Sequence, residues 1–178
     1  MKEKSRRMAL CGVMAALGTV IMLMGGVIPL STFCCPALAG LVLLPVMAEC
    51  GRRMALGVYA VIAVLGVLMG PDKESALLFA FLGYYPVLKV RLDRMKLRPL
   101  RLLAKLAVFN LAAGAALLAV AYLLGMDAVL AEYRELGRIG GIAFAVLANA
   151  TMLLYDRLLP IAQAVYLKKL RPRLTHGA

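Results

Sequence analysis

The feature that most constrains this chain is a run of 41 consecutive uncharged residues, from Met8 to Ala48. The run exceeds one membrane-spanning helix of about 20 residues, and it also exceeds the apolar core of a signal peptide. Pro29 and Pro36 interrupt it. Because proline disfavours a helix interior, we expect two helices here, over residues 8–30 and 36–49, and we expect both to stay in the mature protein.

Four further apolar segments follow, separated by charged residues. They cover residues 54–70, 75–88 and 105–126, and a last one runs from residue 139 through 155 or beyond. Hydrophobic residues make up 63% of the chain and the mean hydropathy is +0.89, too apolar for a water-soluble domain of this size. Continuous apolar stretches indicate helices rather than barrel strands. The sequence predicts an all-α polytopic membrane helix bundle of six transmembrane helices, a single domain over residues 1–178.

Basic residues are distributed unevenly between the two sides of this bundle. One side would carry four at the N-terminus, two in the second connection, seven in the fourth and four in the tail: Lys2, Lys4, Arg6, Arg7, Arg52, Arg53, Lys89, Arg91, Arg94, Lys96, Arg98, Arg101, Lys105, Lys168, Lys169, Arg171 and Arg173. The other side would carry Lys73, Arg134 and Arg138. By the positive-inside rule, both termini lie in the cytoplasm. We therefore expect a multi-pass protein of the plasma membrane.

The net charge of +12 is then explained by the lipid bilayer as a partner. The basic residues flank apolar segments and have no aromatic platform between them, which argues against nucleic-acid binding. Residues 90–104 carry basic side chains at helical spacing among leucines, which predicts an amphipathic helix on the cytoplasmic membrane surface. Residues 168–178 form a basic tail.

Residues for catalysis or metal binding are sparse. The four cysteines form no CxxC pair, and the single histidine, His176, lies in the basic tail. The sequence contains neither an HExxH motif nor a P-loop. We expect no enzyme activity, no metal site and no cofactor, and transport driven by ATP would require another subunit to bind the ATP.

Three polar residues in the last apolar segment require an explanation, because an ionisable or amide group inside a bilayer is costly. Asp156 and Arg157 fall near its cytoplasmic end. Asp156 would pair with a loop arginine while Arg157 reaches the headgroups, or the pair would act in gating or substrate binding. Asn149 lies nearer the middle and would either join two helices or bind a ligand. Asn110, on the preceding helix, is better explained as a helix–helix contact.

The other polar candidates lie on the outer face. Asp72, Lys73 and Glu74 follow Pro71 and precede an apolar segment. They would begin a helix, with acids near the positive end of its dipole, or they would line the mouth of an outward-facing pocket. The connection before residue 139, which includes Arg138, would form the other polar rim. The candidate substrate-binding residues are thus Asp72, Lys73, Glu74, Arg138 and Asn149.

Small residues form a stripe on the first helix. Cys11, Ala15 and Thr19 recur at four-residue spacing, with Gly12 and Ala16 beside them. Small residues at this spacing let two helix backbones approach closely in a membrane. The stripe would pack inside the chain, or it would dock a separate membrane subunit.

In size, in six spans with cytoplasmic ends, in the basic N-terminus before the small-residue stripe and in a short second span, the chain resembles the substrate-binding S components of energy-coupling-factor (ECF) transporters. The resemblance implies a small bundle that binds a vitamin or related micronutrient as its small-molecule substrate. It also implies docking, through Cys11, Gly12, Ala15, Ala16 and Thr19, onto a membrane coupling subunit that works with ATPase subunits. The alternative is a small scaffold or accessory protein of a larger membrane complex. A self-contained transporter is disfavoured, because no internal repeat is evident.

Overall fold

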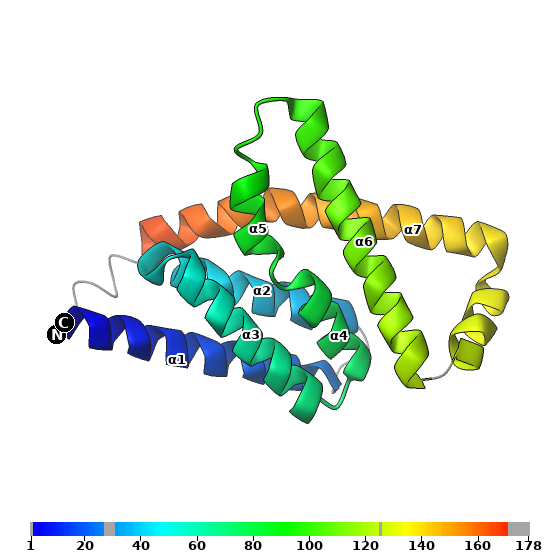
Figure 1. Cartoon of the computed structure of the whole chain (residues 1–178), viewed down its shortest axis with the longest axis horizontal. Coiled ribbons are helices and arrows are strands. Elements are labelled where there is room, and N and C mark those ends of the chain that lie inside the picture. The colour runs from blue at the N-terminus through cyan, green and yellow to red at the C-terminus, as the bar shows by residue number, and fades with distance from the viewer. Residues whose placement is uncertain (1, 27–30, 125, 171–178) are drawn as a thin grey trace.

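The computed structural model describes residues 2–26, 31–124 and 126–170, and within these ranges the chain contains helices and no strands (Figure 1). The helices are α1 (Lys2–Leu23), η1 (Met24–Gly26), α2 (Ser31–Cys50), α3 (Arg52–Met69), α4 (Lys73–Leu82), α5 (Tyr85–Leu92), α6 (Arg98–Leu124), α7 (Met126–Val165) and the π-helical turn η2 (Tyr166–Leu170). The predicted all-α class is confirmed.

Helix α2 lies at the centre of the molecule and contacts α1, α3, α4, α5 and α7. The main core forms where its apolar side chains meet those of α1, α3 and α4. Leu43 and Val46 of α2, Ile62 of α3 and Phe79 of α4 are fully buried there, and Met22 of α1 is nearly so. Helices α1, α2, α3 and α4 therefore form one tightly packed unit.

Helices α6 and α7 build a second layer on this unit. Helix α6 packs on α4 and α7, and α7 also contacts α2. A second cluster joins these helices through Leu44, Tyr85, Phe109, Met152 and Leu159, which lie on α2, α5, α6 and α7. The first part of α7 extends away from the core (Figure 1). This second layer presents much of its apolar surface outward.

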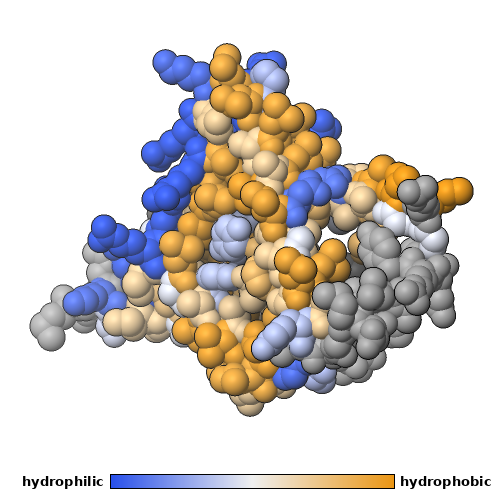
Figure 2. All heavy atoms as spheres, turned by 45° about the vertical axis from the view of Figure 1, so that its right-hand side comes forward, coloured by the Kyte–Doolittle hydropathy of each residue, from blue (hydrophilic) through white to orange (hydrophobic). Residues whose placement is uncertain are grey.

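Membrane-spanning length is reached by five helical segments: Lys4–Leu23, Arg52–Met69, Lys73–Leu92, Arg98–Tyr122 and Ile139–Lys169. A shorter apolar helix covers Cys34–Cys50 and brings the number of apolar segments to the predicted six. Hydrophilic side chains gather along one margin of the molecule, while hydrophobic ones dominate the face beside it (Figure 2). These features are those of a multi-pass membrane protein, and the cytoplasmic placement of both termini stays a prediction.

The start of the second helix, predicted from Pro36, is wrong. The second helix begins at Ser31 rather than at residue 36, so Pro36 and Pro45 both lie inside α2. Proline removes one backbone hydrogen bond, and packing against five neighbouring helices outweighs that loss. Gly40 of α2 allows one of these contacts, because a Cβ there would meet the Tyr155 hydroxyl oxygen at 2.5 Å.

The segments predicted over residues 75–88 and 90–104 are both divided. Helix α4 ends at Leu82 and α5 begins at Tyr85, because Pro86 favours the first turn of a new helix. The predicted amphipathic helix over 90–104 is instead the end of α5, a turn over residues 93–97 and the start of α6. Pro99, the second residue of α6, has the same effect there.

Residues 127–138, predicted as an outer connection, are helical and belong to α7, and a break at Gly137 separates them from the last apolar segment. At Gly137 the backbone has a φ of 64° and a ψ of 176°, a conformation that only glycine adopts readily. The last apolar segment was predicted to begin at residue 139, two residues later. Lys168 and Lys169, the first residues of the predicted basic tail, lie in the π-helical turn η2, and residues 171–178 lie outside the described residues.

Candidate functional site

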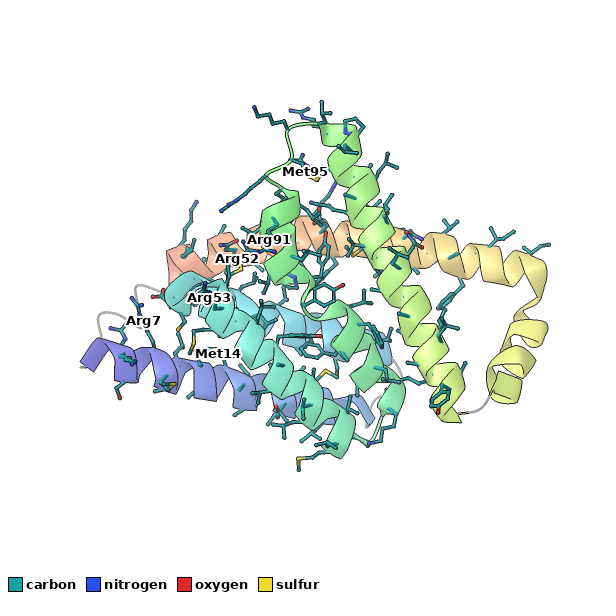
Figure 3. The ribbon with its side chains drawn as sticks, viewed as in Figure 1. Arg7, Met14, Arg52, Arg53, Arg91 and Met95 are labelled. Carbon is teal, nitrogen blue, oxygen red and sulfur yellow. The ribbon has the colours of Figure 1, made fainter. Side chains whose placement is uncertain are left out.

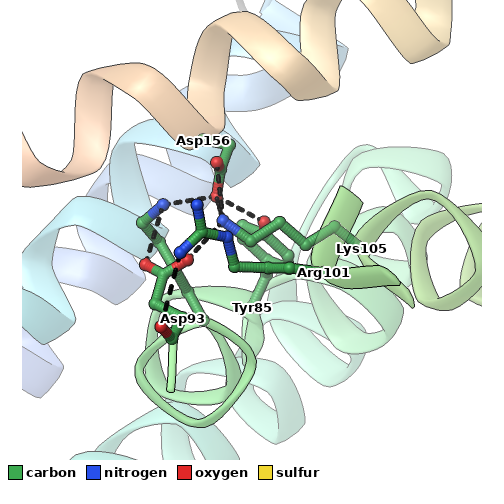
Figure 4. A network of polar contacts seen from close by, with 6 residues as sticks. Tyr85, Asp93, Arg101, Lys105 and Asp156 are labelled. Atoms are coloured by element: carbon green, nitrogen blue, oxygen red, sulfur yellow. Dashed lines mark hydrogen bonds and ion pairs between the residues drawn. The ribbon is translucent and has the colours of Figure 1, made fainter. Parts of the chain in front are cut away.

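A cluster of charged side chains joins α5, α6 and α7 (Figure 4). Lys89 lies on α5, Lys105 on α6 and Asp156 on α7. Asp156 accepts hydrogen bonds from Lys89 Nζ at 2.5 Å, from Lys105 Nζ at 2.8 Å and from the Tyr85 hydroxyl at 2.6 Å. One carboxylate thus receives donors from two other helices, and we call this the Asp156 cluster.

A second carboxylate completes the Asp156 cluster. Asp93, directly after α5, lies 2.6 Å from Lys105 Nζ and 3.3 Å from Lys89 Nζ. Arg101 donates to the Asp93 backbone carbonyl at 3.5 Å. Burial raises the pKa of the Asp93 carboxyl, but its hydrogen bond with Lys105 and the charge of Lys89 outweigh burial and hold that pKa below its usual value. Two carboxylates therefore face two ammonium groups.

This balance decides what the Asp156 cluster can do chemically. The Lys105 side chain is 7% exposed, that of Lys89 13% and that of Asp156 17%. Buried charges with opposite partners and good geometry hold helices in a fixed arrangement, and removing one partner leaves another charge unpaired. The cluster offers no unpaired nucleophile or base. Its geometry is that of a structural clamp between three helices.

The structure favours the structural explanation of the Asp156–Arg157 pair and corrects one partner. Asp156 pairs with two lysines rather than with a loop arginine. Arg157 is exposed, as expected of a side chain that reaches toward lipid headgroups. The sequence did not indicate Tyr85 or Asp93 as members of a cluster. The four-residue spacing of Lys89 and Asp93, which form an ion pair, was the available signal.

Asn149 joins two helices. Its side-chain oxygen accepts from Asn110 Nδ2 at 2.9 Å, and its Nδ2 lies 3.4 Å from Asn110 Oδ1. Each amide also donates to the backbone carbonyl four residues earlier, Leu106 or Ala145. The reciprocal pair bridges α6 and α7, as predicted for Asn110, and it corresponds to the interhelical one of the two alternatives for Asn149.

The outer-face candidates form a helix start. Asp72 is the N-cap of α4, and its carboxylate accepts from the backbone N–H groups of Glu74 at 3.0 Å and Ser75 at 3.1 Å. Lys73 Nζ donates to the Val67 carbonyl at 2.8 Å. These bonds lie at the junction of α3 and α4, whereas Asn149 bonds across α6 and α7. The Arg138 side chain lies outside the described residues, so its predicted place at a pocket rim is not described.

The small-residue stripe of α1 is divided between two sides of the helix. Cys11 and Thr19 are buried, Ala15 is half-buried, and the Thr19 hydroxyl donates to the Ala15 carbonyl at 2.9 Å. Gly12 and Ala16 are exposed, and a Cβ added at Gly12 would have no neighbour within 4 Å. One half of the stripe packs inside the chain and the other half is uncovered.

Comparison of the chain with protein-family models, with curated proteins and with solved structures finds no match. The class that the fold defines is an all-helical protein with apolar helices of membrane-spanning length. Within the described part of the chain, no group of three or more His, Cys, Asp and Glu side chains is arranged to hold a metal ion.

Proposed function

We propose that the chain is a membrane-embedded, non-catalytic subunit that binds a small micronutrient, a vitamin or a precursor, for uptake. In this proposal a separate membrane coupling subunit and ATPase subunits supply the energy, as the resemblance to ECF S components implies. The support comes from a small bundle of apolar helices whose polar clusters are structural. The chain therefore needs a partner to couple transport to energy.

The observation that carries the proposal is the uncovered side of α1. Gly12 and Ala16 are exposed there, and Met8, Val13 and Val20 beside them are 58%, 62% and 53% exposed. The opposite side of the same helix packs on α2 and α3. Small residues between larger apolar ones let a second helix approach closely, which lipid alone does not require. We assign this side of α1 to the coupling subunit.

Replacing Gly12 with leucine tests that assignment. Gly12→Leu adds bulk only on the uncovered side, so the protein should fold as before while co-purification of the coupling and ATPase subunits from native membranes is lost. Gly57→Leu is the matched control, because Gly57 is also exposed on a helix and also has no neighbour within 4 Å. Equal recovery of the ATPase subunits with both variants would contradict docking through α1.

One observation favours the alternative of a scaffold. Asp72, Lys73 and Asn149, expected at a binding pocket, have partners within the chain. A binding subunit held in detergent should gain thermal stability with one compound of a panel of vitamins, precursors and nucleobases. Native mass spectrometry of the untreated protein should show the same compound bound. A scaffold would show neither and would still co-purify with its complex.

A further inference from the structure

A hollow lined by three arginines lies between the start of α3 and helix α5. Arg52 and Arg53 come from α3 and Arg91 from α5, and the hollow has a volume of about 310 Å³. Figure 3 shows the three labelled side chains near one another, where the start of α3 approaches α5. Tyr84 and three aliphatic side chains complete the lining, which includes no acidic residue. We call this hollow the arginine groove.

The guanidinium groups of the groove are available to a ligand. Arg53 and Arg91 are exposed, and their side chains make no hydrogen bond or ion pair with the residues that the structure describes. Arg52 is positioned by a hydrogen bond from Nη2 to the Val87 carbonyl at 3.4 Å, and its buried Nε has no hydrogen-bond partner among the same residues. The N-cap of α3, Gly51, has no side-chain hydrogen bond to the first turn. The positive end of the α3 dipole therefore adds to the attraction for an anion.

An apolar path leads out of the groove along α3. Leu56 lines the groove, and Ala60, Val64 and Leu68 follow it at four-residue spacing, all exposed. Residues at this spacing lie on one side of a helix. A soluble phosphate would use the arginines alone, whereas a phospholipid would also use this path for an acyl chain. The arginines and the apolar path together favour a phospholipid over a soluble phosphate as the ligand.

The positive charge of the groove and its predicted side of the membrane identify the kind of lipid. Arg52, Arg53 and Arg91 all belong to the side predicted to be cytoplasmic, where the leaflet is rich in anionic lipids. We propose that the arginine groove binds the headgroup of an anionic phospholipid of the cytoplasmic leaflet, with an acyl chain along Leu56, Ala60, Val64 and Leu68. This site is separate from the docking side of α1 and from the micronutrient, so it stands independently of the proposed function.

The test measures binding of fluorescent phosphatidylglycerol to the purified full-length protein in phosphatidylcholine nanodiscs. The double variant Arg53→Gln/Arg91→Gln should bind the probe roughly tenfold more weakly. The matched control is Lys168→Gln/Lys169→Gln, which removes the same charge from exposed positions outside the groove and should leave the affinity within about twofold. Arg53→Lys/Arg91→Lys, which retains the charge, should recover most of the binding.

Two outcomes would overturn the proposal. Equal weakening by the groove variant and the lysine control would show attraction to the whole basic surface rather than a site. Displacement of the probe by millimolar glycerol phosphate, which has the charged headgroup but no acyl chain, would show a site for a soluble anion. Thermal unfolding of each variant checks folding. The exposed Arg53 and Arg91 have no partners in the described chain, so neither loss should destabilise it.

Discussion

Lys105 is the residue whose environment differs most from what its sequence position suggests. It was counted among the charges of a cytoplasmic connection, yet its side chain is 7% exposed and lies between the carboxylates of Asp93 and Asp156. Asp156 in turn receives a second lysine and a tyrosine hydroxyl. Residues of three helices therefore depend on one another, and removing one charge should leave another buried charge without its partner and destabilise the protein.

Removing the central carboxylate should be strongly destabilising. Asp156→Ala leaves Lys105 and Lys89 buried with only Asp93 as a counter-charge, so we expect a loss of about 3 kcal/mol in the free energy of unfolding. Arg157→Ala, at the adjacent exposed position, should change it by less than about 0.5 kcal/mol. Unfolding of the purified protein by denaturing detergent measures both. Equal stability of the two variants would show that the Asp156 cluster is not a clamp.

The second carboxylate should give the stability a defined pH dependence. The pKa of Asp93 lies below its ordinary value of 3.8 in the folded protein. Its contribution is therefore fully present above that ordinary value and is lost as the pH falls through the lower, folded-state pKa. Wild type should be more stable than Asp93→Asn at pH 7, and the difference should shrink below about pH 4. A constant difference from pH 7 to pH 3 would contradict the assignment.

The apolar helices could be predicted from the sequence, but the contacts between them could not. Runs of uncharged residues between basic ones located six apolar segments, because membrane-spanning length is a property of local sequence. The contacts of Asp156 with Lys89 and Lys105 connect residues 67 and 51 positions apart, which no local pattern reports. At Pro36 the local rule was wrong, since it predicted that a helix begins at this proline and tertiary packing extends that helix back to Ser31.

Helix α1 illustrates how far a motif can be interpreted. Small residues at four-residue spacing indicated close packing, and the structure shows close packing at Thr19, which is buried. The sequence alone could not tell that Cys11 and Thr19 are buried while Gly12 and Ala16 are exposed. Which side of α1 is covered depends on where the other helices lie, and the local pattern does not report their positions. The docking hypothesis is therefore limited to the two exposed residues.

Packing between α1 and α3 should be sensitive to a single methyl group. A Cβ at Gly18 would overlap the side chain of Ile62, which is fully buried and cannot move aside freely. Gly18→Ala should therefore lower the free energy of unfolding by about 1–3 kcal/mol. Gly57→Ala, with open space around the added Cβ, should not lower it. Thermal unfolding in detergent distinguishes the two, and an unaffected Gly18→Ala variant would refute tight contact at this crossing.

At the scale of the whole molecule, the proposals share one requirement. Docking on one side of α1, uptake from outside and a lipid site in the cytoplasmic leaflet all require six crossings with both ends in the cytoplasm. Lys73 begins the segment Lys73–Leu92, Lys96 follows its end, and both are exposed. They should therefore lie on opposite sides of the membrane.

Labelling of intact cells with a membrane-impermeant thiol reagent tests this requirement most directly. The four native cysteines are first replaced with alanine, and Lys73→Cys and Lys96→Cys are introduced separately. We expect labelling of the cysteine at position 73 from outside, and labelling of that at position 96 only after the membrane is permeabilised. Labelling at position 96 in intact cells would contradict the six-span topology, because it would place the most basic connection of the chain outside.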